Sequence, residues 1–251
     1  MKKVFSTKYK PQRQAIEAII QQFDTTGRNL DNSQRNTIKL FDIGDETFNV
    51  KSFKTPNIIN KIIYRFFRPS KAQRSFEYAH YLLDHGVLTP YPVAYFENKG
   101  TFFFKKSYYI SKHLSYDLTY RELIKNSPYV GDEKLLSAFA KFTFQLHEKG
   151  IHFLDHSPGN TLIQLNDGTP QFYLVDLNRM EFGTMDFEKR LKNFERLSPI
   201  AEQVRVMADT YATLIDKDPK LVYDKMWGYI SSFQDKFQRK KRLKKRYKFW
   251  G

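Results

Sequence analysis

The stretch from residue 151 to residue 180 constrains the fold of this chain more than any other, because it sets three metal-capable polar side chains in two short loops. The first loop carries Asp155 and Asn160, which are five residues apart. Between them, Pro158 and Gly159 force an irregular backbone, since proline fixes φ and glycine reaches conformations closed to other residues. We therefore expect neither helix nor strand in this loop.

A hairpin is predicted directly after the loop. Residues 161–165 form an apolar run of strand length, and an Asp-Gly pair at 167–168 favours a tight hairpin turn. The return strand, residues 172–175, leads into Asp176. Hairpin geometry can therefore bring Asp176 back beside Asn160.

An Asp, an Asn five residues later and an Asp that ends the next hairpin suit phosphoryl transfer. One carboxylate receives the proton of an acceptor hydroxyl, while an amide oxygen and a second carboxylate hold Mg²⁺ against nucleotide phosphates. At these positions the chain resembles the protein-kinase-like superfamily, in which Asp155 matches the catalytic Asp, Asn160 the loop Asn and Asp176 the start of the Asp-Phe-Gly element. The resemblance implies catalysis by Asp155 and metal binding by Asn160 and Asp176.

Three positions depart from ordinary eukaryotic protein kinases. The chain has Asp176-Leu177-Asn178 in place of Asp-Phe-Gly, and Phe153 where a His stands two residues before the catalytic Asp. The Ser-Pro-Gly-Asn ending of the loop instead resembles the bacterial small-molecule branch, which includes sugar, antibiotic and lipopolysaccharide-core kinases.

The same resemblance implies nucleotide-binding residues in the first half of the chain. Lys51, near the end of a predicted strand, matches the lysine that holds the α- and β-phosphates, with Lys54 as its rival. Glu77, on a predicted helix, is the candidate that positions this lysine, although it could also be a surface charge. Gly27 and Arg28 lie where a phosphate-covering flap belongs, and an ordinary turn is an equally good interpretation there.

Local patterns predict the surrounding elements. Apolar residues recur at helical spacing from Pro11 to Phe23, and we expect the basic residues 1–9 before them to be loosely held. Ser70 suits the N-cap of a helix that stops before Gly86. Strands are expected at 38–43, 47–54, 93–97, 101–104 and 107–111, and further helices at 118–124, 132–150, 185–197, 199–215 and 220–233.

The segment FRPSKAQRSFEYAHYLLDHGVLTPYPVAYFE, residues 67–97, sharpens the resemblance. Its basic Ser-Lys-Ala-x-Arg-Ser run, its helix and its Gly-Val-x-Thr-Pro-x-Pro sequence resemble the lipopolysaccharide kinase family, over about residues 35–180. The resemblance implies an α+β, protein-kinase-like fold of two lobes. A small antiparallel sheet lobe, residues 1–112, would face a mainly helical lobe, residues 113–251, with ATP and Mg²⁺ in the cleft between them. The acceptor would be a hydroxyl of an inner-core lipopolysaccharide sugar, Kdo or heptose, on a lipid A-core precursor.

The formal charge of +15 implies a polyanionic partner or surface. Residues 237–250 are rich in lysine and arginine and end in aromatic residues, which suits an anionic membrane surface and, nearly as well, nucleic acid. The chain has no cysteine, and no apolar run approaches the roughly 20 residues that span a bilayer. With the resemblance, these features predict a cytoplasmic protein, peripheral on the inner face of the inner membrane, with nucleic acid as the less favoured partner.

Two alternatives remain open at this stage. The chain could be a kinase that acts on a protein or on a soluble small molecule. It could also be a catalytically silent kinase-like module that binds membrane or nucleic acid, an interpretation favoured by the missing glycine-rich pattern and by Asp176-Leu177-Asn178.

Overall fold

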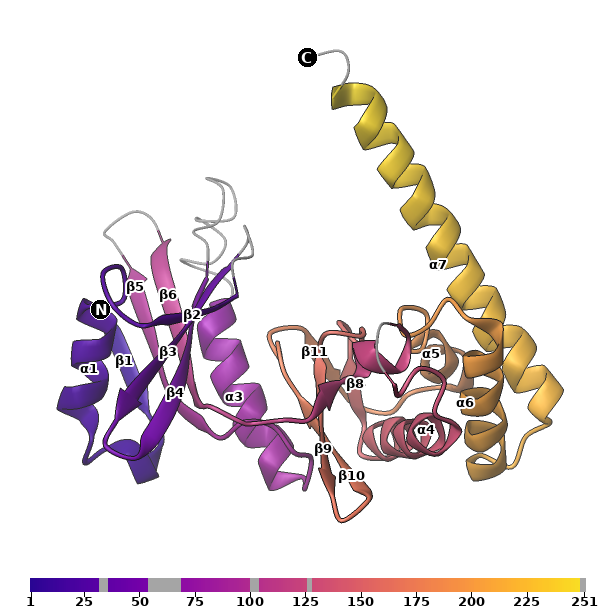
Figure 1. Cartoon of the computed structure of the whole chain (residues 1–251), viewed down its shortest axis with the longest axis horizontal. Coiled ribbons are helices and arrows are strands. Elements are labelled where there is room, and N and C mark those ends of the chain that lie inside the picture. The colour runs from indigo at the N-terminus through magenta and orange to yellow at the C-terminus, as the bar shows by residue number, and fades with distance from the viewer. Residues whose placement is uncertain (32–35, 54–68, 100–103, 126–127, 249–251) are drawn as a thin grey trace. The chain divides into compact units, whose positions relative to one another are not determined.

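The computed structural model describes residues 1–31, 36–53, 69–99, 104–125 and 128–248. The chain divides into two compact units (Figure 1). The first comprises Met1–Ser115 together with Asp176–Asn178, and the second comprises Tyr116–Val175 and Arg179–Gly251. The sequence suggested a division after residue 112 and assigned residues 176–178 to the later lobe.

A six-stranded antiparallel sheet forms the centre of the first unit. The predicted hairpin within residues 38–54 is present as two paired strands, with Lys51 opposite Ile38 on one side and Tyr109 on the other. The strands lie in the order β1 (Lys2–Phe5), β5 (Pro92–Lys99), β6 (Phe104–Lys112), β4 (Glu46–Phe53), β3 (Asn36–Ile43) and β2 (Arg28–Asp31). Of the strand expected at 101–104, residues 101–103 lie outside the described residues, and Phe104 begins β6.

The N-terminal residues were expected to be loosely held, and that prediction is wrong. Lys2–Phe5 form β1, which pairs with β5 at one edge of the sheet, and the short 3₁₀ helix η1 (Thr7–Tyr9) follows. Phe5 packs against the apolar core of the first unit, and Tyr9 is fully buried in it. Strand pairing with β5 and burial of Tyr9 therefore fix the N-terminal segment, although its basic composition suggested that it would be loosely held.

Two helices belong to the first unit. The helix α1 (Arg13–Gln21) begins two residues after Pro11 and buries Ile16, Ile19 and Ile20. The helix α3 (Lys71–Asp84) has the predicted cap, because the Ser70 hydroxyl accepts a hydrogen bond from the Gln73 N–H at 3.0 Å.

The second unit is mainly helical. Helix α6 (Ala201–Leu214) packs against both α4 (Glu133–Glu148) and α7 (Pro219–Lys248), and the three share an apolar core that includes Phe139, Tyr211 and Met226, all fully buried (Figure 1). Its helices are α4 (Glu133–Glu148), α5 (Phe187–Lys192), α6 (Ala201–Leu214) and α7 (Pro219–Lys248). Its short strands are β7 (Leu118–Thr119), β8 (Ile151–Phe153), β9 (Thr161–Asn166), β10 (Thr169–Leu174) and β11 (Met180–Phe182).

The helix expected at 118–124 is not formed as predicted. Residues 118–119 form β7, which pairs with β9, and a 3₁₀ helix, η2 (Tyr120–Leu123), follows. Leu118 pairs with Ile163, so β7 adds a third strand to the hairpin sheet. Tertiary pairing overrides local helix propensity here.

The predicted hairpin is confirmed as β9 and β10. These strands pair antiparallel from Asn166↔Thr169 to Leu174↔Thr161. Asp167 and Gly168 occupy the turn with φ of 49° and 78°, the left-handed conformations that a tight hairpin turn requires. The hydrogen bonding between the two strands continues one step beyond them, where the Val175 N–H donates to the Asn160 carbonyl at 3.0 Å.

The helix α7 runs further than its expected end near residue 233. Residues 231–248 contain neither glycine nor proline and many strong helix formers, so helical structure continues through the basic run. Beyond the core, Phe237 is 54% exposed and Leu243 is 52% exposed, and α7 extends away from the other helices of its unit (Figure 1). In the part of the chain that the structure describes, no helix has both the length and the apolar character to cross a bilayer.

A prediction concerns Gly27, which precedes β2. Its φ is +88°, and an added Cβ would lie 2.5 Å from the Phe41 ring. We expect Gly27→Ala to lower the free energy of unfolding of the first unit by roughly 2–4 kcal/mol, because left-handed strain adds to overpacking. Hydrogen exchange of the β3 and β4 amides measures the effect.

Gly44→Ala is the matched control, because Gly44 has φ of +57° and no atom within 4 Å of the added Cβ. Gly44→Ala should lower the free energy of unfolding only by the strain of its left-handed backbone, about 1 kcal/mol. Equal losses in the two variants would contradict the packing role of Gly27.

Candidate active site

Lys51 and Asp176 meet in the first unit. Lys51 lies on β4 between the buried Val50 and Phe53, and its side chain is 14% exposed. Its Nζ lies 2.7 Å from Asp176 Oδ1. The sequence left Lys51 and Lys54 as rivals; Lys51 is the one placed at Asp176, and Lys54 lies outside the described residues.

Leu177 and Asn178, which stand in place of the Phe and Gly of Asp-Phe-Gly, both have structural roles. Leu177 is 2% exposed and anchors the segment by burial. Asn178 donates from its amide nitrogen to Asp176 Oδ1 at 2.6 Å. Asp176 itself has φ of 59°, a left-handed backbone that costs a non-glycine residue of order 1–3 kcal/mol and is common at functional sites. Burial and hydrogen bonding together hold the Asp176 carboxylate at Lys51.

Glu77 is not brought to Lys51. It is exposed on α3 and accepts a hydrogen bond from the Gln73 side chain at 2.7 Å. No ion pair joins Glu77 to Lys51 among the described residues; the inward face of α3 presents side chains such as Ala72 and Phe76 instead. The positioning role predicted for Glu77 therefore has no support in this geometry.

Gly27 and Arg28 have structural partners. Gly27 turns the chain against the Phe41 ring, as described above. The Arg28 guanidinium lies 3.1 Å from the Asp42 carboxylate, and both side chains are largely exposed. An ordinary turn and a surface ion pair account for these two residues, and their phosphate-binding role stays a prediction.

Asp155 lies in the second unit between two guanidinium groups. Its Oδ1 accepts hydrogen bonds from Arg179 Nη1 at 3.1 Å and from Arg196 Nη1 at 3.0 Å. Its side chain is 20% exposed. Both bonds go to the same oxygen, so within the described residues Oδ2 is left to accept from a substrate hydroxyl. The arrangement suits an oriented, charge-stabilised base.

Asn160 is oriented by its own loop. Its amide nitrogen donates to the Asp155 carbonyl at 2.8 Å, and this bond identifies the other amide atom as the oxygen, an acceptor suited to a metal ion. The Asp176 carboxylate is the second oxygen donor that the sequence predicts. Among the described residues no group of three or more His, Cys, Asp or Glu side chains could hold a metal. Asn160 belongs to the second unit and Asp176 to the first, and each side chain is an oxygen donor of the kind that Mg²⁺ prefers.

A buried polar network contacts the strand that leads into the Asp155 loop. His147 contacts the Tyr211 hydroxyl at 2.7 Å through Nδ1 and the Asn193 amide oxygen at 3.1 Å through Nε2. Asn193 in turn donates to the Phe153 carbonyl at 2.9 Å. Burial lowers the pKa of His147 to about 4 and that of His156, the residue after Asp155, to about 3. Both imidazoles are therefore neutral at pH 7.

Sequence reasoning missed the partners of Asp155. Arg179 and Arg196 are two among 42 basic residues, and neither belongs to a recognised motif. Arg196 also places its guanidinium 5.3 Å from the Phe233 ring centroid on α7. Proximity to Asp176 in sequence was the only available signal for Arg179, and nothing in the sequence marks Arg196.

Comparisons with known proteins agree with this geometry. A family model described as the lipopolysaccharide kinase (Kdo/WaaP) family matches residues 47–216. A solved structure described as WaaP in complex with acyl carrier protein is similar with a TM-score of 0.62 and 13% identity, and covers 95% of this chain and 99% of that chain. At that identity the likeness concerns the fold, and it confirms the predicted kinase-like α+β architecture. A search of curated proteins gave no match.

The buried histidines predict a pH-dependent stability. Because folding lowers both pKa values, the unfolded state takes up protons first as the pH falls below the ordinary histidine pKa near 6.5. The free energy of unfolding of the second unit should therefore be at its full value above about pH 6.5. It should fall toward pH 4 by about 1.4 kcal/mol per pH unit for each histidine. Urea unfolding followed by Trp227 fluorescence measures it.

His147→Gln separates this effect from the titration of carboxylates. Glutamine keeps hydrogen-bonding groups but does not titrate, so the variant should lose about half of the histidine-dependent slope. Identical slopes in the variant and the wild type would show that His147 is not the titrating group.

Proposed function

Because the chain belongs to the lipopolysaccharide kinase (Kdo/WaaP) family, we propose that it transfers the γ-phosphoryl group of ATP to a hydroxyl of an inner-core sugar, Kdo or heptose. Members of this family are kinases, and the chain is accordingly a phosphotransferase. One observation carries the proposal: the matched span, residues 47–216, contains the proposed base Asp155 and both proposed metal ligands.

Each residue has a defined task in the proposed transfer. Asp155 accepts the proton of the acceptor hydroxyl, while Arg179 and Arg196 hold its carboxylate in place. A bond forms between the acceptor oxygen and the γ-phosphorus, and the bond from that phosphorus to the bridging oxygen breaks, which leaves ADP.

Asn160 and Asp176 supply oxygen ligands for Mg²⁺, and Lys51 contributes its charge to the phosphates. The bound cation would neutralise charge on the transferred group and on the departing phosphate. The Lys51 ammonium lies 2.7 Å from Asp176 Oδ1, so a phosphate held by Lys51 and a cation held by Asp176 would be neighbours.

The test is ATP-dependent phosphate transfer to a purified Kdo-bearing lipid A precursor with Mg²⁺ present. We expect Asp155→Ala to reduce the rate by about 10²–10⁴-fold, the usual contribution of a positioned base. Asp176→Asn should abolish turnover without unfolding the chain, because it removes the metal carboxylate and keeps the shape. Asp167→Asn is the matched control, since Asp167 also has a positive φ, 49°, but lies in the hairpin turn.

The other outcomes decide between the alternatives. A wild type that binds ATP with Mg²⁺ but phosphorylates only protein or a soluble molecule would make the acceptor assignment wrong. A wild type that binds no nucleotide would leave a silent kinase-like module.

We further propose that the enzyme works on the cytoplasmic face of the inner membrane, with the basic end of α7 against anionic lipid. The exposed Phe237 and Leu243 supply apolar contacts, and the lysines and arginines between and beyond them supply charge. Nucleic acid is the competing partner for the same segment.

A charge-neutralising variant tests the membrane role of α7. Replacing Lys240, Lys241 and Arg242 by glutamine should weaken binding to phosphatidylglycerol-containing vesicles by roughly 100-fold, at about 1 kcal/mol for each charge. Co-sedimentation measures binding, and the control replaces the exposed Lys134, Lys141 and Lys217 elsewhere in the same unit. Equal binding by both variants, or tighter binding to RNA than to vesicles, would contradict the proposal.

A further inference from the structure

Arg196 connects the proposed base to the last helix of the second unit. Its Nη1 donates to Asp155 Oδ1 at 3.0 Å. Its guanidinium carbon lies 5.3 Å from the centroid of the Phe233 ring on α7, within the distance at which a cation and an aromatic ring attract each other. One guanidinium group therefore contacts both the Asp155 carboxylate and an aromatic ring that is distant from it in the sequence.

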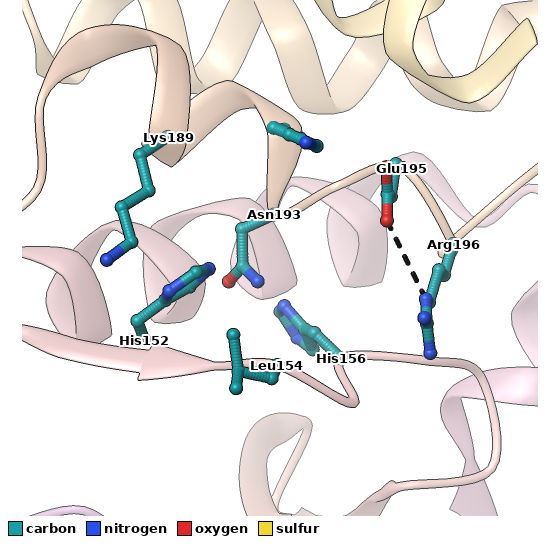
Figure 2. A pocket seen from close by; sticks show the side chains of 8 residues that line it. His152, Leu154, His156, Lys189, Asn193, Glu195 and Arg196 are labelled. Carbon is teal, nitrogen blue, oxygen red and sulfur yellow. Dashed lines mark ion pairs between the residues drawn. The ribbon is translucent and has the colours of Figure 1, made fainter. Parts of the chain in front are cut away.

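Hydrogen bonding alone does not fix the plane of the Arg196 guanidinium. Its Nη1 binds Asp155, but its Nε is buried and has no hydrogen-bond partner among the described residues. Glu195, which lines the same pocket as Arg196, forms an ion pair with Nε (Figure 2). The distance of that pair, 3.7 Å, is too long for a hydrogen bond. A bidentate pair would set the plane of the group, whereas a single bond leaves it free to turn, so the Phe233 ring supplies the missing constraint.

The helix α7 is also attached to the segment that leads to Arg196. Lys225 Nζ and the Tyr229 hydroxyl both bind the carboxylate of Glu188 on α5, each at 2.5 Å. Lys225, Tyr229 and Phe233 follow one another at intervals of four residues, so they lie along one face of α7. The same face of α7 therefore holds α5 and, one turn further along, the Arg196 side chain.

We propose that Phe233 is a positioning residue of the phosphoryl transfer, because its ring keeps the Arg196 guanidinium aligned on the Asp155 carboxylate. This inference rests on the proposed function. Phe233 acts only through Arg196, and Arg179 still donates to the same Asp155 oxygen when the ring is absent. Loss of the ring should therefore misalign the base without abolishing its ion pairing.

Nitrogen-15 NMR of the full chain without nucleotide tests the contact independently of catalysis. The Nε–H signal of Arg196, assigned by its loss in Arg196→Gln, should be displaced from those of exposed arginines by the ring current of Phe233. Phe233→Leu keeps an apolar side chain but removes the ring, so the signal should return to the position of exposed arginines. Phe233→Tyr keeps the ring and should keep the wild-type signal.

The transfer assay tests the effect on the base. Phe233→Leu should lower kcat about 2–10-fold, the range expected for one guanidinium–ring contact, and leave the KM for ATP unchanged. Phe233→Tyr should retain the wild-type kcat. In a chain that already carries Arg196→Gln, Phe233→Leu should have no further effect on kcat, because the two residues act as one unit.

Tyr223→Leu is the matched control. Tyr223 also lies on α7, and the guanidinium carbon of Arg205 on α6 lies 4.1 Å from the centroid of its ring. The variant removes a contact of the same kind from the same helix. It should leave both the Arg196 signal and kcat at their wild-type values.

The outcomes separate this inference from the proposed function. Phosphate transfer by Phe233→Leu at the wild-type rate, or an equal loss of kcat in Phe233→Leu and Tyr223→Leu, would overturn the positioning role and leave the kinase. An Arg196 signal that depends on the Phe233 ring, in a chain that transfers phosphate to no acceptor, would support the contact and overturn the proposed function.

Discussion

The ion pair between Lys51 and Asp176 is the interaction on which the candidate active site depends. The three residues from Asp176 to Asn178 belong to the sheet unit, although the chain before and after them belongs to the helical unit. Buried Leu177 and the Asn178 amide fix this short segment at its place. Asn178 stands where the kinase pattern has glycine. Its backbone is less free than that of glycine, but its side chain adds a hydrogen bond to Asp176 that holds the carboxylate in one position.

The loss of the histidine that usually precedes the catalytic Asp is offset elsewhere. Phe153 occupies that position and is fully buried, so its side chain contributes to the core. Its carbonyl receives the Asn193 amide, which also contacts His147. The polar support for the loop therefore comes from α4 and from the segment after α5, and two arginines orient Asp155. The missing histidine is thus compensated by contacts that are distant in sequence.

Features determined by short-range chemistry could be predicted from the sequence. The Asp-Gly turn, the Ser70 cap and the hairpin that leads to Asp176 each depend on neighbouring residues, and all three are present. Features determined by packing could not. Glu77 lies on the exposed face of α3, away from the side of the helix that packs on the sheet. The strand β1 forms because the edge of β5 is available for pairing. The arginines at Asp155 lie 24 and 41 residues away along the chain, and no local pattern marks them.

The length of α7 has a geometric consequence. Residues 231–248 extend the helix about 27 Å beyond its last core contact at Ile230, at 1.5 Å of rise per residue. A continuous helix resists bending, so its free end and the rest of its unit turn as one body. If the free end were held at a planar surface, the core contact at Ile230 could lie no further than about 27 Å from that surface. A reaction partner on the same surface would then be met within a thin layer, which makes encounter frequency depend on surface density.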